Sequence, residues 1–117
     1  MAKDDYFTIV YYLLKYLYAC VKEGIKPRED MIMLKEYPAD INESYIQYIL
    51  ITMQENEYIK GIDTINVPIL GNGMVETIKS ISNIQVTPIG IEYLENNNMM
   101  HKAYDTLKKF KDLIPFI

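Results

Sequence analysis

NESYIQYILITMQENEYIKGI, residues 42–62, is the stretch that decides the fold, because its apolar residues change their spacing partway along it. Up to Asn56 they recur three and four residues apart, which predicts a helix over 42–56 with Asn42 as its N-cap. From Tyr58 onward the pattern predicts a strand instead. The buried face of the predicted helix consists of Ile46, Ile49, Leu50 and Met53.

The segment 58–86 predicts a long hairpin or a three-stranded wing after this helix. Its first strand runs toward Pro68, a residue that is typical of strand edges and strand breaks. Gly71-Asn72-Gly73 is a strong turn signal, because these residue types tolerate positive φ. Residues 75–78 and 84–86 are the candidate return strands.

The segment before residue 42 predicts a long helix and a short one. The long helix covers 5–23, and Gly24 is suited to end it. A short helix over 28–34 and a turn over 36–40 follow. The core stripe of the long helix consists of Val10, Leu13, Leu14, Leu17 and Val21.

The segment after the hairpin predicts two more helices. Thr87-Pro88 opens the first, with threonine as the N-cap and proline at the first helical position. Three asparagines at 96–98 break it, and a last helix follows over about 100–114. Its apolar stripe consists of Ala103, Leu107, Phe110 and Ile114.

The order of these elements predicts an α+β, mainly helical fold. We expect a winged helix-turn-helix with a long β-wing and two C-terminal helices. Residues 1–117 form a single domain in this prediction, with a core over about 5–97 and the C-terminal helix over about 100–114. A chain of this length buries about two thirds of its unfolded surface, which is enough for one core.

Four segments carry a resemblance to a known family. Residues 86–94, VTPIGIEYL, look like the end-of-wing signature of bacterial winged-helix proteins, and Gly90 in it allows the helix to approach the strand closely. Together with 95–104, 16–24 and 57–61, they resemble the YjcQ family of small bacterial and prophage proteins. The resemblance implies a winged-helix fold and a prophage origin, and it transfers no catalytic or ligand-binding residue.

The composition argues against catalytic and metal chemistry. The chain has one cysteine and one histidine, so neither a disulfide within the chain nor a two-histidine metal site can form. We expect Cys20 to be a buried structural thiol. We also expect no enzymatic activity and no cofactor. The first residues lack a signal-peptide pattern and no apolar run reaches a membrane span, so we expect a cytoplasmic protein that does not enter the membrane.

Double-stranded DNA is the first partner that the predicted fold suggests. In a helix-turn-helix the second helix reads base edges, and here it would present Ser44, Gln47 and Tyr48. The basic residues Arg28, Lys35 and Lys60 could contact the phosphate backbone. However, the net charge is −4, and 42–56 contains no lysine or arginine. These charges count against DNA, since phosphate contacts supply much of the affinity.

The fold favours a DNA-binding protein or transcriptional regulator slightly, and the alternative is a winged-helix protein-interaction module that does not bind DNA. The first helix is unusually wide in its apolar face and rich in tyrosine. That face either packs under a second helix of the same chain or forms a dimer surface or a peptide groove. A homodimer through the first and last helices is a related hypothesis. The candidate interaction residues are Tyr11, Tyr18, Leu107 and Phe110.

Overall fold

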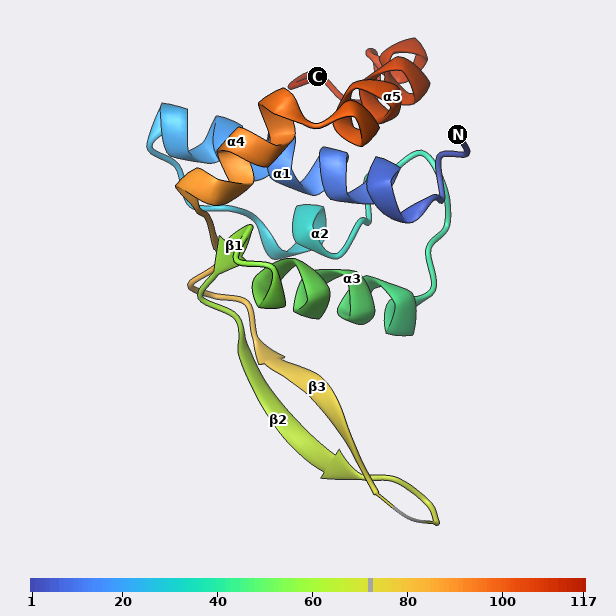
Figure 1. Ribbon diagram of the computed structural model, residues 1–117, viewed down its shortest axis with the longest axis vertical. Coiled ribbons are helices and arrows are strands. Elements are labelled where there is room, and N and C mark those ends of the chain that lie inside the picture. Colours follow the sequence, from blue (N-terminus) through green and yellow to red (C-terminus); the bar gives the residue numbers. More distant parts are fainter. Residues whose placement is uncertain (72) are drawn as a thin grey trace.

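The computed structural model describes residues 1–71 and 73–117, and it is an α+β fold with a projecting hairpin (Figure 1). Two separate two-stranded sheets form, one from β1 and β4 and the other from β2 and β3. No helix in this part of the chain is long and apolar enough to cross a membrane. The elements are α1 Tyr6–Glu23, α2 Glu29–Ile32, α3 Glu43–Glu55, β1 Ile59–Lys60, β2 Asp63–Pro68, β3 Met74–Ser80, β4 Gln85–Val86, α4 Pro88–Asn96, α5 Asn98–Leu107 and the 3-10 helix η1 Lys108–Phe110.

Helix α1 is the central layer of the helical body. Figure 1 shows α4 and α5 on one side of it and α2 and α3 on the other. Residues 8–14 are all buried, so the helix is apolar around almost its whole circumference. The wide apolar face therefore packs within the same chain. Cys20 is buried as predicted, at 2% exposure.

The ends of α1 follow the prediction, but one residue of its core stripe does not. Asp5 caps the start by accepting a hydrogen bond from the Phe7 N–H, and Gly24 ends the helix in the left-handed conformation with φ 69°. Val21, which we predicted to be buried, is 54% exposed. It lies in the last turn, beyond the point where another element covers that face of the helix.

Helices α2 and α3 agree with the predicted elements. Helix α2 is one turn long, and Leu34 after it adopts a positive φ of 61° and is buried. Asn42 caps α3 by accepting from the Ser44 N–H. All four residues predicted for its buried face are buried.

The segment predicted as one long strand is two strands, and a three-stranded wing does not form. Gly61 separates β1 from β2 with φ 90°, and a Cβ there would lie 1.9 Å from the Asn83 carbonyl oxygen. Strand β1 pairs with β4, whereas β2 pairs with β3 as an independent hairpin. Gly71 and Gly73 adopt positive φ as the turn signal predicted, and Asn72 lies outside the described residues.

The C-terminal segment forms a shorter helix than predicted. Asn97 caps α5 by accepting from the Met99 N–H, and the helix ends at Leu107 rather than near 114. The 3-10 turn after it redirects the chain so that Ile114 is fully buried and Phe116 packs on Tyr12 at 5.3 Å. Burial of these two side chains favours the bend over two more helical turns.

Gly90 holds α4 against β1, as the sequence predicted. A Cβ at this position would lie 2.1 Å from the Tyr58 carbonyl oxygen. Thr87 caps the helix by accepting from the Gly90 N–H, and its own N–H donates to the same Tyr58 carbonyl. Only glycine fits this contact, because any side chain would collide with backbone.

Candidate interaction site

Gln47 of α3 is bound to the hairpin rather than free to read bases. Its Oε1 accepts from the Thr77 hydroxyl at 2.6 Å and from the Ile78 N–H at 3.3 Å. Ile78 lies in β3, so this side chain satisfies a donor on the outer edge of that strand. The structure therefore gives Gln47 a bracing role that the sequence prediction missed.

Gln54, two helical turns further along α3, braces the base of the same hairpin. Its Nε2 donates to the Ile62 carbonyl at 2.9 Å, and its Oε1 accepts from the Ile62 N–H at 2.8 Å. One side chain thus replaces the pair of bonds that a neighbouring strand would make. The signal in the sequence is the seven-residue spacing of Gln47 and Gln54, which places both on one face of the helix.

The remaining outward face of α3 carries no positive charge. Ser44 is exposed, and Tyr48 is 58% exposed with its ring 6.2 Å from that of Tyr6. Glu43 and Glu55 are the charged residues of this helix, and both are exposed. Phosphate groups would be repelled by these carboxylates.

The three basic residues predicted to contact the phosphate backbone of DNA lie in different surroundings. Arg28 forms an ion pair with Asp30, which occupies part of its guanidinium. Lys35 follows α2 and Lys60 ends β1, and both side chains are exposed. The stretch 36–59 between them holds no lysine or arginine.

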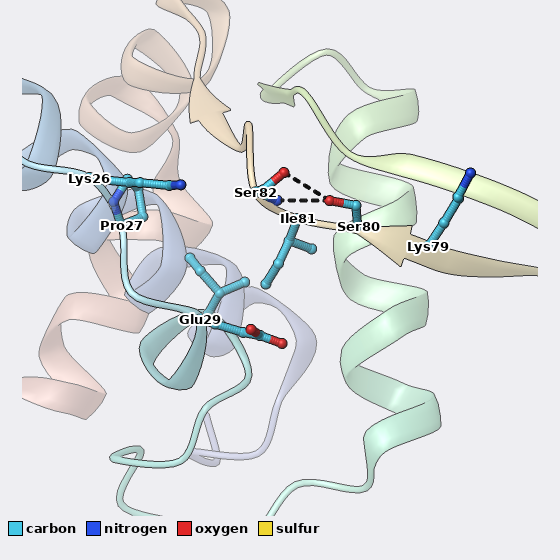
Figure 2. A pocket seen from close by; sticks show the side chains of 8 residues that line it. Lys26, Pro27, Glu29, Lys79, Ser80, Ile81 and Ser82 are labelled. Carbon is cyan, nitrogen blue, oxygen red and sulfur yellow. Dashed lines mark hydrogen bonds between the residues drawn. The ribbon is translucent and has the colours of Figure 1, made fainter.

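A cavity of about 360 Å³ lies between the α1–α2 loop, α2 and the base of the hairpin. Figure 2 shows Lys26 and Lys79 on opposite sides of it, with Ser80 and Ser82 between them. The two serine hydroxyls lie 2.9 Å apart, and Glu29 also lines the cavity. Two lysines from different parts of the chain thus line one cavity.

The outer part of the hairpin is an uncharged apolar surface. The pairing of Ile65 with Thr77 and of Val67 with Val75 places these residues in register, on one face of the sheet. Residues 64–75 contain no charged side chain, which is the sequence signal that could have identified the surface. The large apolar residues exposed here are Ile65, Ile69, Leu70, Met74 and Val75.

The four residues predicted to form a protein-interaction surface differ in their burial. Tyr11 is 6% exposed and Leu107 is fully buried, so both belong to the core of a single chain. Tyr18 and Phe110 are half-buried. The Lys22 ammonium lies 4.4 Å from the Tyr18 ring centroid, and that of Lys3 lies 4.9 Å from the Phe110 ring centroid.

These observations define the class of protein: a small α+β domain with a central buried helix and a hairpin braced by its third helix. The chain belongs to the YjcQ family, whose model, described as YjcQ protein, matches residues 11–113. This confirms the resemblance seen in the sequence. Neither the curated proteins nor the solved structures contain a match.

Proposed function

We propose that this protein is a winged-helix protein-interaction module that binds another protein through its hairpin and third helix. The order α1, α2, α3, hairpin supports the winged-helix interpretation, with β2 and β3 as the wing. The proposal includes no catalysis and no cofactor. A cytoplasmic location and a prophage origin remain predictions.

The exposed apolar surface of the hairpin carries this proposal. Among the described residues, eleven large hydrophobic side chains are exposed, and five of them lie between Ile65 and Val75. Leu70 at the tip has an exposure of 106%, so it contacts nothing in this chain. Apolar patches of this kind on soluble domains mark interaction sites.

The partner that this surface fits is a different protein with an apolar patch bordered by lysine or arginine. The hairpin and α3 expose four carboxylates, those of Asp63, Glu76, Glu43 and Glu55, against the single lysine of the hairpin, Lys79. Strand pairing with a second copy is disfavoured, because β2 has a register shift at its start and Pro68 at its end. Both features protect sheet edges from pairing.

A photo-crosslinker placed at Leu70 in the producing cells tests the proposal. We expect it to capture a partner whose purified form binds the chain, with binding weakened at least about tenfold by Leu70→Asp or Met74→Asp. Leu113→Asp, which changes an exposed leucine far from the hairpin, is the matched control and should bind normally. Equal binding by the hairpin variants would overturn the proposal. So would capture of only a second copy.

A DNA-binding regulator is the second candidate, and one observation favours it. Lys26 and Lys79 border one cavity beside α2 at the wing base, where a winged helix would meet the phosphate backbone. Titration with genomic DNA fragments at low salt tests it. A salt-dependent shift that is abolished by Lys26→Glu together with Lys79→Glu would favour DNA over a protein partner. Absence of any shift would exclude this candidate.

A further inference from the structure

Four tyrosines from separate parts of the chain form two neighbouring ring pairs, which we call the tyrosine face: Tyr6, Tyr48, Tyr58 and Tyr93. They come from the start of α1, from α3, from the turn before β1 and from α4. The Tyr58 and Tyr93 rings stack with their centroids 4.2 Å apart and an interplanar angle of 21°. Tyr6 and Tyr48 form a second pair, edge to face, with their centroids 6.2 Å apart.

Tyr6 is held against α3 and interacts electrostatically with the second aromatic pair. The Tyr6 hydroxyl lies 2.7 Å from the Thr52 hydroxyl, which fixes its ring against α3. Burial raises the pKa of Tyr93 to about 12, and the neighbouring Tyr58 and Tyr6 hydroxyls raise it further. Burial likewise raises the pKa of Tyr6, and Tyr48 and Tyr58 contribute. The Tyr6 and Tyr58 phenols are therefore close enough to Tyr93 to affect its ionisation.

A groove runs along the Tyr58–Tyr93 end of this face. It has a volume of about 330 Å³, and its lining includes Ile89, which is 49% exposed. Asn96 and Asn97 at its far side supply polar groups. An apolar floor with a few amide groups is typical of sites that bind an extended peptide.

The charged groups that line the groove or act on the Tyr6 phenol are carboxylates. Glu92 lines the groove, and Glu55 lies close enough to Tyr6 to raise the pKa of its phenol, after burial and the two neighbouring tyrosines. No lysine or arginine is among the residues that line this groove. A cation could therefore approach both the carboxylates and the negative faces of the rings.

We propose that the tyrosine face binds a proline-rich peptide segment that carries lysine or arginine. Proline-rich segments form a polyproline II helix before binding, so little entropy is lost when their rings pack on aromatic side chains. The cation of the peptide pairs with Glu92 or Glu55 and lies against a tyrosine ring. Neither DNA nor an acidic peptide fits this face, because both lack the cation and the proline rings that it would bind.

This site is separate from the hairpin surface, so its test is independent of the proposed function. The probes are three synthetic peptides of equal length: a proline-rich peptide flanked by arginines, the same peptide flanked by glutamates, and an arginine-flanked version with alanine in place of proline. Binding is followed by chemical-shift changes of the tyrosine-face residues and by calorimetry. Leu70→Asp, a hairpin change, should leave binding of the first peptide unchanged.

We expect the arginine-flanked proline peptide to bind at least about tenfold more tightly than the other two, because each lacks one of the two features recognised. Glu92→Lys and Tyr93→Ala should each weaken binding at least about tenfold, whereas Tyr93→Phe, which keeps the ring, should retain it. Higher salt should weaken it as well. Absence of shifts in the tyrosine-face residues would overturn the proposal, and so would equal binding of the glutamate-flanked or alanine peptide.

Discussion

Two glutamines on α3 decide how the hairpin is held. Gln54 supplies both a donor and an acceptor to Ile62, at the point where β1 ends and β2 has not begun. Gln47 only accepts, taking one hydrogen bond from the Thr77 hydroxyl and one from the Ile78 N–H of β3. A buried or half-buried backbone group without a partner is costly, so these amides stabilise the junction. If Gln47 turned to read an adenine, it would first have to release the hairpin.

Gln54→Ala is expected to lower the free energy of unfolding by about 1–3 kcal/mol, because it leaves both backbone groups of Ile62 without a partner. Urea unfolding measures the change. Glu55→Ala is the matched control on the next residue, which is exposed, and it should stay within about 0.5 kcal/mol of the parent. If Gln54→Ala matched this control, the bracing role would be wrong.

At the scale of one element, α1 shows how burial depends on what covers a helix. The helix is covered on both sides by other helices along most of its length. Leu17 is therefore fully buried, but Val21, one turn later on the same predicted stripe, is exposed. Helical spacing predicts which residues share a face, but the neighbouring elements decide where that face reaches solvent.

Leu17→Ala is expected to lower the free energy of unfolding by about 2–5 kcal/mol, because it leaves a cavity in a fully buried position. Val21→Ala in the same helix should change it by less than about 0.5 kcal/mol. Thermal or urea unfolding of both variants checks the difference. Equal losses in the two variants would contradict the burial that the structure assigns.

At the scale of the whole molecule, tyrosines from distant parts of the chain are buried together. Tyr12 packs edge to face on Tyr37 at 4.8 Å and also meets Phe116 near the C-terminal end of the chain. The Tyr37 hydroxyl donates to the Lys3 carbonyl, which ties the N-terminal segment to the same cluster. Segments near both ends of the described chain thus contact the same aromatic cluster, formed by Tyr12, Tyr37 and Phe116.

This burial predicts a loss of stability at high pH. Burial raises the pKa of Tyr12 from 10 to about 12, and nearby Glu36 raises it further. Below pH 10 the phenol is protonated in both the folded and the unfolded chain, so stability does not depend on it. Between pH 10 and about 12 the unfolded chain releases its proton first, so stability falls as pH rises.

The urea midpoint, measured from pH 8 to pH 11, checks this expectation. It should begin to fall near pH 9, where the buried Cys20 thiol starts to contribute, and fall more steeply above about pH 10, where Tyr12→Phe should make the fall shallower. Val21→Ala removes no hydroxyl and should keep the slope of the parent. A slope unchanged by Tyr12→Phe would show that Tyr12 does not contribute.

Most local features of the candidate site could be predicted from the sequence, but most of its contacts between distant residues could not. The bounds of α3 and its buried face follow from helical spacing and the Asn42 cap. The engagement of Gln47 with Thr77 could not be predicted, because the two lie thirty residues apart and meet only when the hairpin folds beside α3. For the same reason, the sequence could not show that the tyrosines of α1, α3 and α4 lie near one another.

The sequence by itself determined α1, α3 and α4, the caps at Asn42 and Thr87, the hairpin turn, the close contact at Gly90 and the family. Each depends on interactions within a few residues, or on a close contact that only glycine permits because it has no side chain. The tertiary structure alone decided that β1 and β2 are separate strands, that Tyr11 and Leu107 lie in the core, and that the hairpin exposes its apolar residues. These outcomes depend on which distant elements pack together, and that is set by burial over the whole chain.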